Sequence, residues 1–133
     1  MAEPPARSAM RSPLGRAIGL GSAKEGVDHW WAERITAIAL VPLTLWFVIA
    51  VIELAGADRA AFVEWVRHPV PAVLLVLLLI ATFYHNALGL QVVIEDYVAN
   101  EGAKLAALIV MKLAAFLLAA LGIFSVLKLA FVP

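Results

Sequence analysis

Length, composition and charge exclude several classes of protein. The chain has 133 residues, of which 64% are hydrophobic and 15% charged, and its mean hydropathy is +0.96. These values are typical of membrane proteins and exclude an ordinary soluble domain. Ten basic residues balance ten acidic ones, so net charge does not indicate nucleic-acid binding. The absence of cysteine excludes disulfides, iron–sulfur clusters held by this chain's thiolates and covalently attached c-type haem.

The N-terminal segment differs in composition from the rest of the chain. Residues 1–28 contain prolines, glycines and serines and lack the apolar segment of a signal peptide. We expect a cytoplasmic arm over residues 1–28 that lies along a soluble partner or is disordered. Residues 29–133 are expected to form a three-helix transmembrane domain.

Long apolar segments predict an all-α membrane protein. At about 1.5 Å per residue, each segment is long enough to cross a bilayer core. The expected transmembrane helices cover about residues 30–53, 70–97 and 105–126. The third segment is interrupted by Lys112, whose long side chain either reaches back to the interface or faces a partner; we favour the former. Asp58 is expected to cap a short interfacial helix between the first two segments.

Basic residues near the ends of the apolar segments predict the orientation. They are Arg7, Arg11, Arg16 and Lys24 in the N-terminal segment, Arg59 and Arg67 in the first loop and Lys104 in the second. Because basic residues are retained on the cytoplasmic side, we expect the N-terminus and the second loop in the cytoplasm. The C-terminus is then on the opposite side of the membrane.

The second apolar segment contains an unusual ionisable residue, His85. Ionisable groups within a membrane are costly and commonly functional. Two interpretations are open: a neutral imidazole hydrogen-bonded to a neighbouring helix, or an axial ligand of a haem bound between helices. Gly89, one turn away, leaves room for a porphyrin or another helix. A haem with two histidine ligands would require the second histidine from another chain.

Asp96 and Tyr97 lie at the end of the same segment. Eleven residues at about 100° each place His85 and Asp96 on one helix face, separated by about 16 Å along the axis. A tyrosine hydroxyl donates hydrogen bonds to carbonyl oxygens, and a neighbouring carboxylate orients it or passes protons. These groups suit a quinone-reduction site, although they are also common as the polar boundary of a transmembrane helix.

Two motifs resemble a known family, the hydrophobic membrane anchor (D) subunit of succinate dehydrogenase, respiratory complex II. In the segment 84–98, a histidine is followed four residues later by glycine and eleven residues later by Asp-Tyr, as in that family. The segment 26–40 is similar to the start of the family's first transmembrane helix, where an arginine precedes x-Thr-Ala. Asp28 departs from the family pattern, because relatives often have a histidine there, and this leaves the role of His29 open.

The resemblance implies roles for particular residues. His85 is implied to be one axial ligand of a b-type haem, with the other ligand supplied by the cytochrome b anchor subunit. Arg34 is implied to lie near the haem propionates, as suits a bidentate guanidinium, or else to act only as a positive-inside anchor. Tyr97 is implied to donate to a ubiquinone carbonyl, with Asp96 beside it.

The resemblance also implies partners and a location. Succinate is oxidised at a flavoprotein subunit, electrons pass through an iron–sulfur subunit, and this chain forms part of the quinone site without catalysing a reaction alone. The expected location is the bacterial cytoplasmic membrane, with the quinone site facing the cytoplasm. Two alternatives remain open: the anchor of a quinol–fumarate reductase, and a haem-free structural or transport accessory protein.

Overall fold

The computed structural model describes residues 12–14 and 25–132. Four helices account for most of residues 25–132: α2 (Glu25–Glu53), α3 (Arg59–Arg67), α4 (Pro69–Tyr97) and α5 (Glu101–Phe131). Among them, α2, α4 and α5 are long and apolar enough to cross a membrane. The prediction of an all-α protein with three transmembrane helices is confirmed. Most of the expected N-terminal arm lies outside the described residues.

Both outer helices extend beyond the predicted apolar segments. α2 begins at Glu25, before the expected start at about residue 30, and α5 continues to Phe131, past the expected end at about 126. Hydropathy marks the part of a helix that matches the hydrocarbon core, whereas backbone hydrogen bonding continues into the polar interface. Pro42 lies within α2 without ending it.

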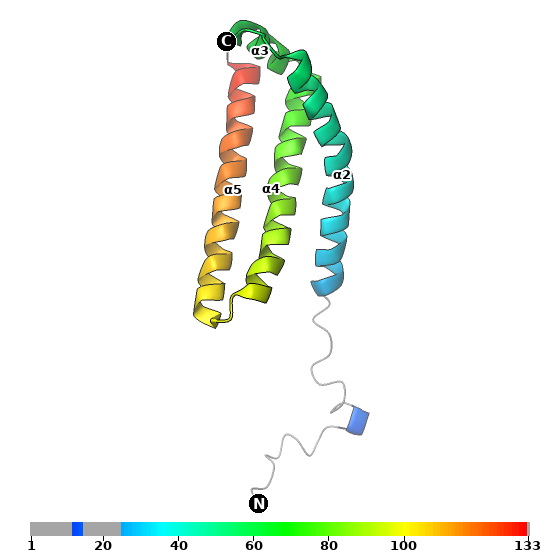
Figure 1. The fold of residues 1–133 in the computed structure, drawn as a ribbon, viewed down its shortest axis with the longest axis vertical. Helices are drawn as coiled ribbons and strands as arrows, with labels where there is room; N and C mark the ends of the chain where they lie inside the picture. The colour runs from blue at the N-terminus through cyan, green and yellow to red at the C-terminus, as the bar shows by residue number, and fades with distance from the viewer. Residues whose placement is uncertain (1–11, 15–24, 133) are drawn as a thin grey trace, which may run out of the picture.

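α4 is the central helix of the described structure. It packs against α2 on one side and α5 on the other, while no described Cα atom of α2 lies within 8 Å of one in α5. Figure 1 shows these helices side by side, with the start of α2, the end of α4 and the start of α5 at one end. The chain therefore forms an open layer of helices rather than a closed bundle.

The short helix α3 closes the opposite end. Asp58 accepts a hydrogen bond from the Ala61 amide at 2.8 Å, which satisfies one free amide at the start of α3 as expected. Trp65 of α3 stacks on Trp46 of α2, with 5.9 Å between ring centroids. Arg67 donates to the Val132 carbonyl oxygen at 3.1 Å. Contacts to both α2 and the end of α5 hold α3 across this end of the layer.

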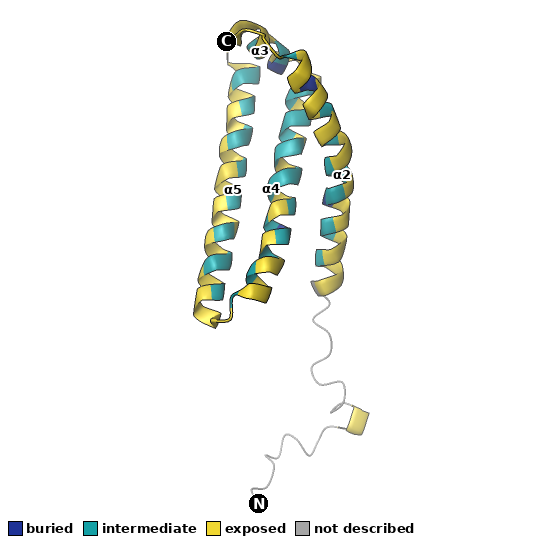
Figure 2. Cartoon of the chain, viewed as in Figure 1, coloured by how far each residue is buried: buried dark blue, intermediate teal, exposed yellow. Residues whose placement is uncertain are grey.

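Few side chains are buried within the chain alone. In the described part, the buried residues are Thr36, Ala50, Val66 and Leu88, and exposed positions cover much of every long helix (Figure 2). Apolar residues such as Ile38, Phe116 and Phe124 are largely exposed. Such surfaces are stable only against lipid or a partner, because water would disfavour an apolar area of this extent.

The closest glycine approach between α4 and α5 is at Gly122. A Cβ added there would lie 3.2 Å from both terminal carbons of Leu79, whereas one added at Gly26 would meet nothing within 4 Å. Small residues permit this kind of close contact between transmembrane helices. Gly122 therefore sets the spacing between α4 and α5 at this level.

We expect Gly122→Leu to lower the free energy of unfolding by about 1–3 kcal/mol, because the larger side chain forces Leu79 and the two helices apart. The measurement is the thermal stability of the purified complex that contains the chain. Gly26→Leu serves as the control, since its added side chain enters open space. Equal stability of the two variants would contradict a packing role for Gly122.

Candidate functional site

His85 contacts the neighbouring helix through a hydrogen bond. It lies on α4, is partly buried, and its Nδ1 is 2.9 Å from the Thr36 Oγ1 on α2. Thr36 is 9% exposed and is the only buried polar residue in the described part of the chain. This hydrogen bond joins α2 to α4, so Thr36 and His85 lie at the same depth in the layer of helices.

Thr36 is also bonded to its own helix. Its hydroxyl lies 2.7 Å from the Ala32 carbonyl oxygen and 3.1 Å from the Glu33 carbonyl oxygen, one turn earlier in α2. A threonine hydroxyl in a helix commonly donates to such a carbonyl. The imidazole is therefore connected to the α2 backbone through a single hydroxyl group.

The other imidazole nitrogen of His85, Nε2, makes no hydrogen bond to any described residue. A Cβ added at Gly89, one turn further along α4, would meet nothing within 4 Å. The described residues contain no group of three or more His, Cys, Asp or Glu side chains able to hold a bare metal ion. A haem iron is held mainly by its porphyrin and needs one imidazole from this chain, so the donor set fits a haem.

Arg34 lies two residues before Thr36, towards the end of the layer where α2 begins. Its guanidinium carbon is 5.2 Å from the ring centroid of Trp30, within the range of a cation–π interaction. Arg34 is exposed and forms no ion pair with a described residue. Its guanidinium is thus available to an anionic group, and the Arg34 backbone lies about 3 Å along the axis of α2 from that of Thr36, towards the start of the helix.

His29 adds an unsatisfied polar group at the same end of α2. Its Nε2 is buried and has no hydrogen-bond partner among the described residues. Buried polar atoms in native proteins are nearly always hydrogen-bonded, so a group outside the described residues is expected to complete the contact. No hydrogen bond joins His29 to His85.

Asp96 and Tyr97 lie at the C-terminal end of α4 and are exposed. The neighbouring carboxylate of Glu95 instead accepts a hydrogen bond from Gln91 Nε2 at 2.8 Å. Neither Asp96 nor Tyr97 makes a side-chain hydrogen bond to another described residue. Their polar groups are thus open to a ligand or a partner, and their backbone positions lie about 16 Å and about 18 Å from that of His85 along the helix axis.

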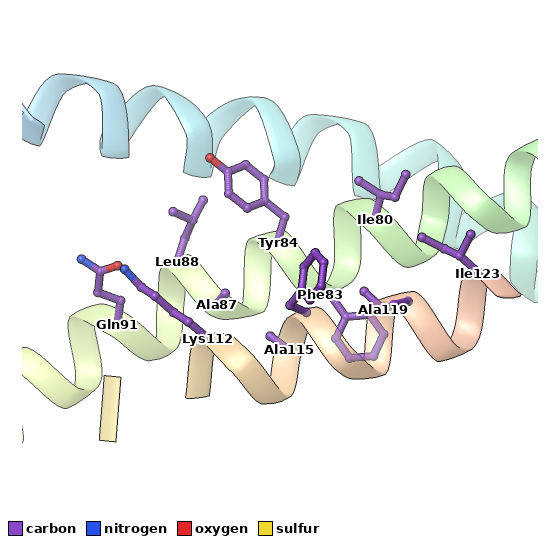
Figure 3. A pocket seen from close by; sticks show the side chains of 12 residues that line it. Ile80, Phe83, Tyr84, Ala87, Leu88, Gln91, Lys112, Ala115, Ala119 and Ile123 are labelled. Atoms are coloured by element: carbon purple, nitrogen blue, oxygen red, sulfur yellow. The ribbon is translucent and has the colours of Figure 1, made fainter. Parts of the chain in front are cut away.

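A groove of about 660 Å³ lies between α4 and α5, mostly lined by apolar side chains. Lys112 and Gln91 are polar residues in its wall, and Figure 3 shows both at the same end of the groove. Lys112 is exposed and forms no ion pair with a described residue. His85 and Tyr97 do not line this groove, so it is separate from the site predicted from the sequence.

The site has two parts at different depths. His85, Thr36 and Arg34 lie where α2 meets α4, and Asp96 and Tyr97 lie at the nearby end of α4. The sequence motif therefore places an imidazole inside the layer and a polar pair at its edge. A ligand bound at His85 and a ligand bound at Asp96 and Tyr97 would therefore occupy distinct positions.

The chain is similar to proteins of one known family. Residues 8–119 match the family model of the succinate dehydrogenase/fumarate reductase transmembrane subunit. The chain belongs to this family. The match covers α2, α3, α4 and most of α5, and so includes every residue of the two-part site. The resemblance inferred from segments 26–40 and 84–98 is confirmed.

Individual members of the anchor family are similar over most of the chain. The succinate dehydrogenase hydrophobic membrane anchor subunit of Rickettsia bellii is 35% identical over 103 residues, 77% of this chain and 82% of the relative. The subunit of the same name from Paracoccus denitrificans is 36% identical over 98 residues, 74% of this chain and 75% of the relative. No solved structure matches this chain significantly.

Sequence reasoning missed the contact of Thr36 with His85. Thr36 entered only as part of the motif that follows Arg34, without a role of its own. Counted from the observed helix ends, Thr36 lies 11 residues after the start of α2 and His85 12 residues before the end of α4, so these polar residues lie at similar depth, a signal that the expected start at about residue 30 concealed. That signal does not reveal which helix faces meet, because apolar lipid and apolar helix contacts leave similar residue patterns.

Proposed function

We propose that this chain is the membrane anchor subunit of a succinate:ubiquinone oxidoreductase and that it helps to bind a b-type haem and form the quinone-reduction site. Family membership supports the anchor role, and the relatives with 35% and 36% identity are named as succinate dehydrogenase anchors. The observation that carries the haem assignment is the orientation of His85, with Nδ1 bonded to Thr36 and Nε2 unbonded to any described residue.

The haem site would use this chain's residues in complementary ways. His85 would supply one axial nitrogen, while Gly89 leaves space for the flat porphyrin beside α4. Arg34 would bind a propionate, since its guanidinium has no acidic partner among the described residues. The companion cytochrome b subunit would supply the second axial ligand, as the family resemblance implies. When bound, the haem supplies one-electron redox chemistry.

The quinone site would form at the end of α4. Tyr97 would donate its hydroxyl hydrogen to a ubiquinone carbonyl oxygen, and Asp96 would orient that hydroxyl or accept protons from water. Both residues are exposed in the isolated chain, which suits a site completed by other subunits. The iron–sulfur subunit would cover this end and deliver electrons received from the flavoprotein subunit.

The proposed orientation in the membrane rests on the distribution of basic residues. The start of α2, the end of α4 and the start of α5 lie together (Figure 1); in the sequence, the basic residues of the N-terminal segment precede α2, and Lys104 is in the first turn of α5. The positive-inside rule places this end, and therefore Tyr97, on the cytoplasmic side of a bacterial inner membrane. The C-terminus would lie on the opposite side.

Quinol–fumarate reduction is a second candidate, because the matched family model includes fumarate reductase subunits. The same anchor would serve either direction, since net flux depends on cofactor potentials and on the quinone. The Rickettsia bellii and Paracoccus denitrificans relatives are named as succinate dehydrogenase subunits, which favours succinate oxidation. The ratio of succinate–ubiquinone to quinol–fumarate turnover in the purified complex distinguishes the directions.

The decisive experiment is the purification of a tagged copy of this chain from its native membrane. We expect flavoprotein, iron–sulfur and cytochrome b subunits to copurify with it, and a reduced-minus-oxidised spectrum to show b-type haem. Copurifying subunits without haem would retain the anchor role and refute the haem assignment. The absence of both would leave a haem-free accessory protein.

A further inference from the structure

The hydrogen bonds at Thr36 determine which nitrogen of His85 carries a proton. The Thr36 hydroxyl lies within hydrogen-bond distance of the Ala32 and Glu33 carbonyl oxygens and of His85 Nδ1. Carbonyl oxygens only accept hydrogen bonds, and a hydroxyl has a single hydrogen to donate. At 2.7 Å the Ala32 contact requires that hydrogen, because two oxygens at this distance repel each other without one.

The remaining contact then has one consistent assignment. If the Thr36 hydroxyl donates to α2, its oxygen accepts a hydrogen bond, so His85 Nδ1 must carry the proton. In a neutral imidazole the proton on Nδ1 leaves a lone pair on Nε2, the nitrogen that makes no hydrogen bond to a described residue. The opposite tautomer would place lone pairs on both Nδ1 and the hydroxyl oxygen along their 2.9 Å contact.

The geometry points to Thr36 as a positioning residue for the haem iron: it holds His85 as the Nδ1–H tautomer and directs the Nε2 lone pair away from α2. This inference rests on the proposed haem ligation by His85. Metal-binding histidines commonly donate their second N–H to a fixed acceptor, which orients the ring and makes the ligand nitrogen more basic. Here the acceptor is a hydroxyl whose own orientation is set by the α2 backbone.

A consequence for the haem follows from ligand basicity. A more basic imidazole stabilises ferric iron relative to ferrous iron, so the Thr36 hydrogen bond lowers the haem midpoint potential. Removing the hydroxyl should raise that potential and weaken haem retention. Valine has nearly the same shape as threonine but lacks the hydroxyl. If Thr36 acted only by packing, Thr36→Val would therefore leave the haem midpoint potential unchanged.

The test compares variants in the purified complex. We expect Thr36→Val to release haem to an excess of apomyoglobin about tenfold faster or more than the wild type, and to raise the haem midpoint potential. Thr36→Ser should restore both properties, because it keeps the hydroxyl. Thr44→Val is the matched control, since Thr44 lies two turns further along α2, is exposed and has no side-chain hydrogen bond to a described residue.

The outcomes separate this inference from the proposed function. His85→Ala is measured in parallel: if it leaves the low-spin haem signal intact, haem ligation by His85 is refuted and the role of Thr36 is refuted with it. If His85→Ala abolishes that signal while Thr36→Val behaves as wild type, only the positioning role is overturned. Should the valine variant fail to assemble, Thr36→Ala provides the same comparison with Thr36→Ser.

Discussion

Replacing His85 with alanine is expected to abolish the low-spin haem signal of the complex. The substitution removes the proposed axial nitrogen together with its hydrogen bond to Thr36. Because loss of an outer hydrogen-bond partner alone costs about 10- to 100-fold in metal affinity, loss of the ligand itself should reduce six-coordinate haem to less than about a tenth of the wild-type content. Optical and paramagnetic resonance spectra of the purified complex measure this.

The control for this substitution is His68→Ala. His68 is exposed, lies between α3 and α4, and has no side-chain cap hydrogen bond. We expect it to retain wild-type haem content and subunit composition. A complex with His85→Ala that keeps a wild-type low-spin spectrum would show that the iron takes its ligands elsewhere. His85 would then be only a link between α2 and α4.

Tyr97→Phe is expected to reduce succinate–ubiquinone turnover by about tenfold to a hundredfold. The change removes the hydroxyl proposed to bind the quinone carbonyl while preserving the ring, and leaving a buried polar partner without its hydrogen bond costs about 1–3 kcal/mol, which corresponds to this range. Electron transfer from succinate to a soluble artificial acceptor should be unchanged, because that reaction occurs before the quinone site. The measurement is the ratio of these two activities.

The chain offers a closely matched control. Tyr84 is the only other tyrosine, and it lies on α4 in the wall of the groove shared with α5. Tyr84→Phe makes the same chemical change away from the end of α4, and we expect it to leave both activities intact. Equal quinone kinetics for Tyr97→Phe and Tyr84→Phe would remove Tyr97 from the quinone site.

The distance between His85 and Tyr97 allows the two substitutions to be interpreted independently. His85 and Tyr97 are about 18 Å apart along one helix, so a substitution at one need not disturb the other. Distant substitutions without shared partners usually have additive effects. A spectral change confined to His85→Ala and a kinetic change confined to Tyr97→Phe would therefore be independent results.

Much of the fold follows from the order of residues along the chain. Apolar segments of sufficient length predicted three transmembrane helices, and Asp58 predicted the start of the short helix between the first two. The helical period places His85 and Asp96 on one face of α4 without any knowledge of tertiary contacts. These features depend on local hydrogen bonding and on the thickness of the bilayer, which a sequence reports directly.

The order of residues alone predicts that this is a membrane protein, that it has three long helices, and how deep His85 lies relative to Tyr97. The pairing of the helices required the three-dimensional structure: α4 lies between α2 and α5, Gly122 contacts Leu79, and Thr36 faces His85. Hydropathy cannot reveal these pairings, because a lipid-facing surface and a helix-facing surface are equally apolar. Only packing and hydrogen bonding between helices distinguish them, and these depend on residues 49 positions apart in the case of Thr36 and His85.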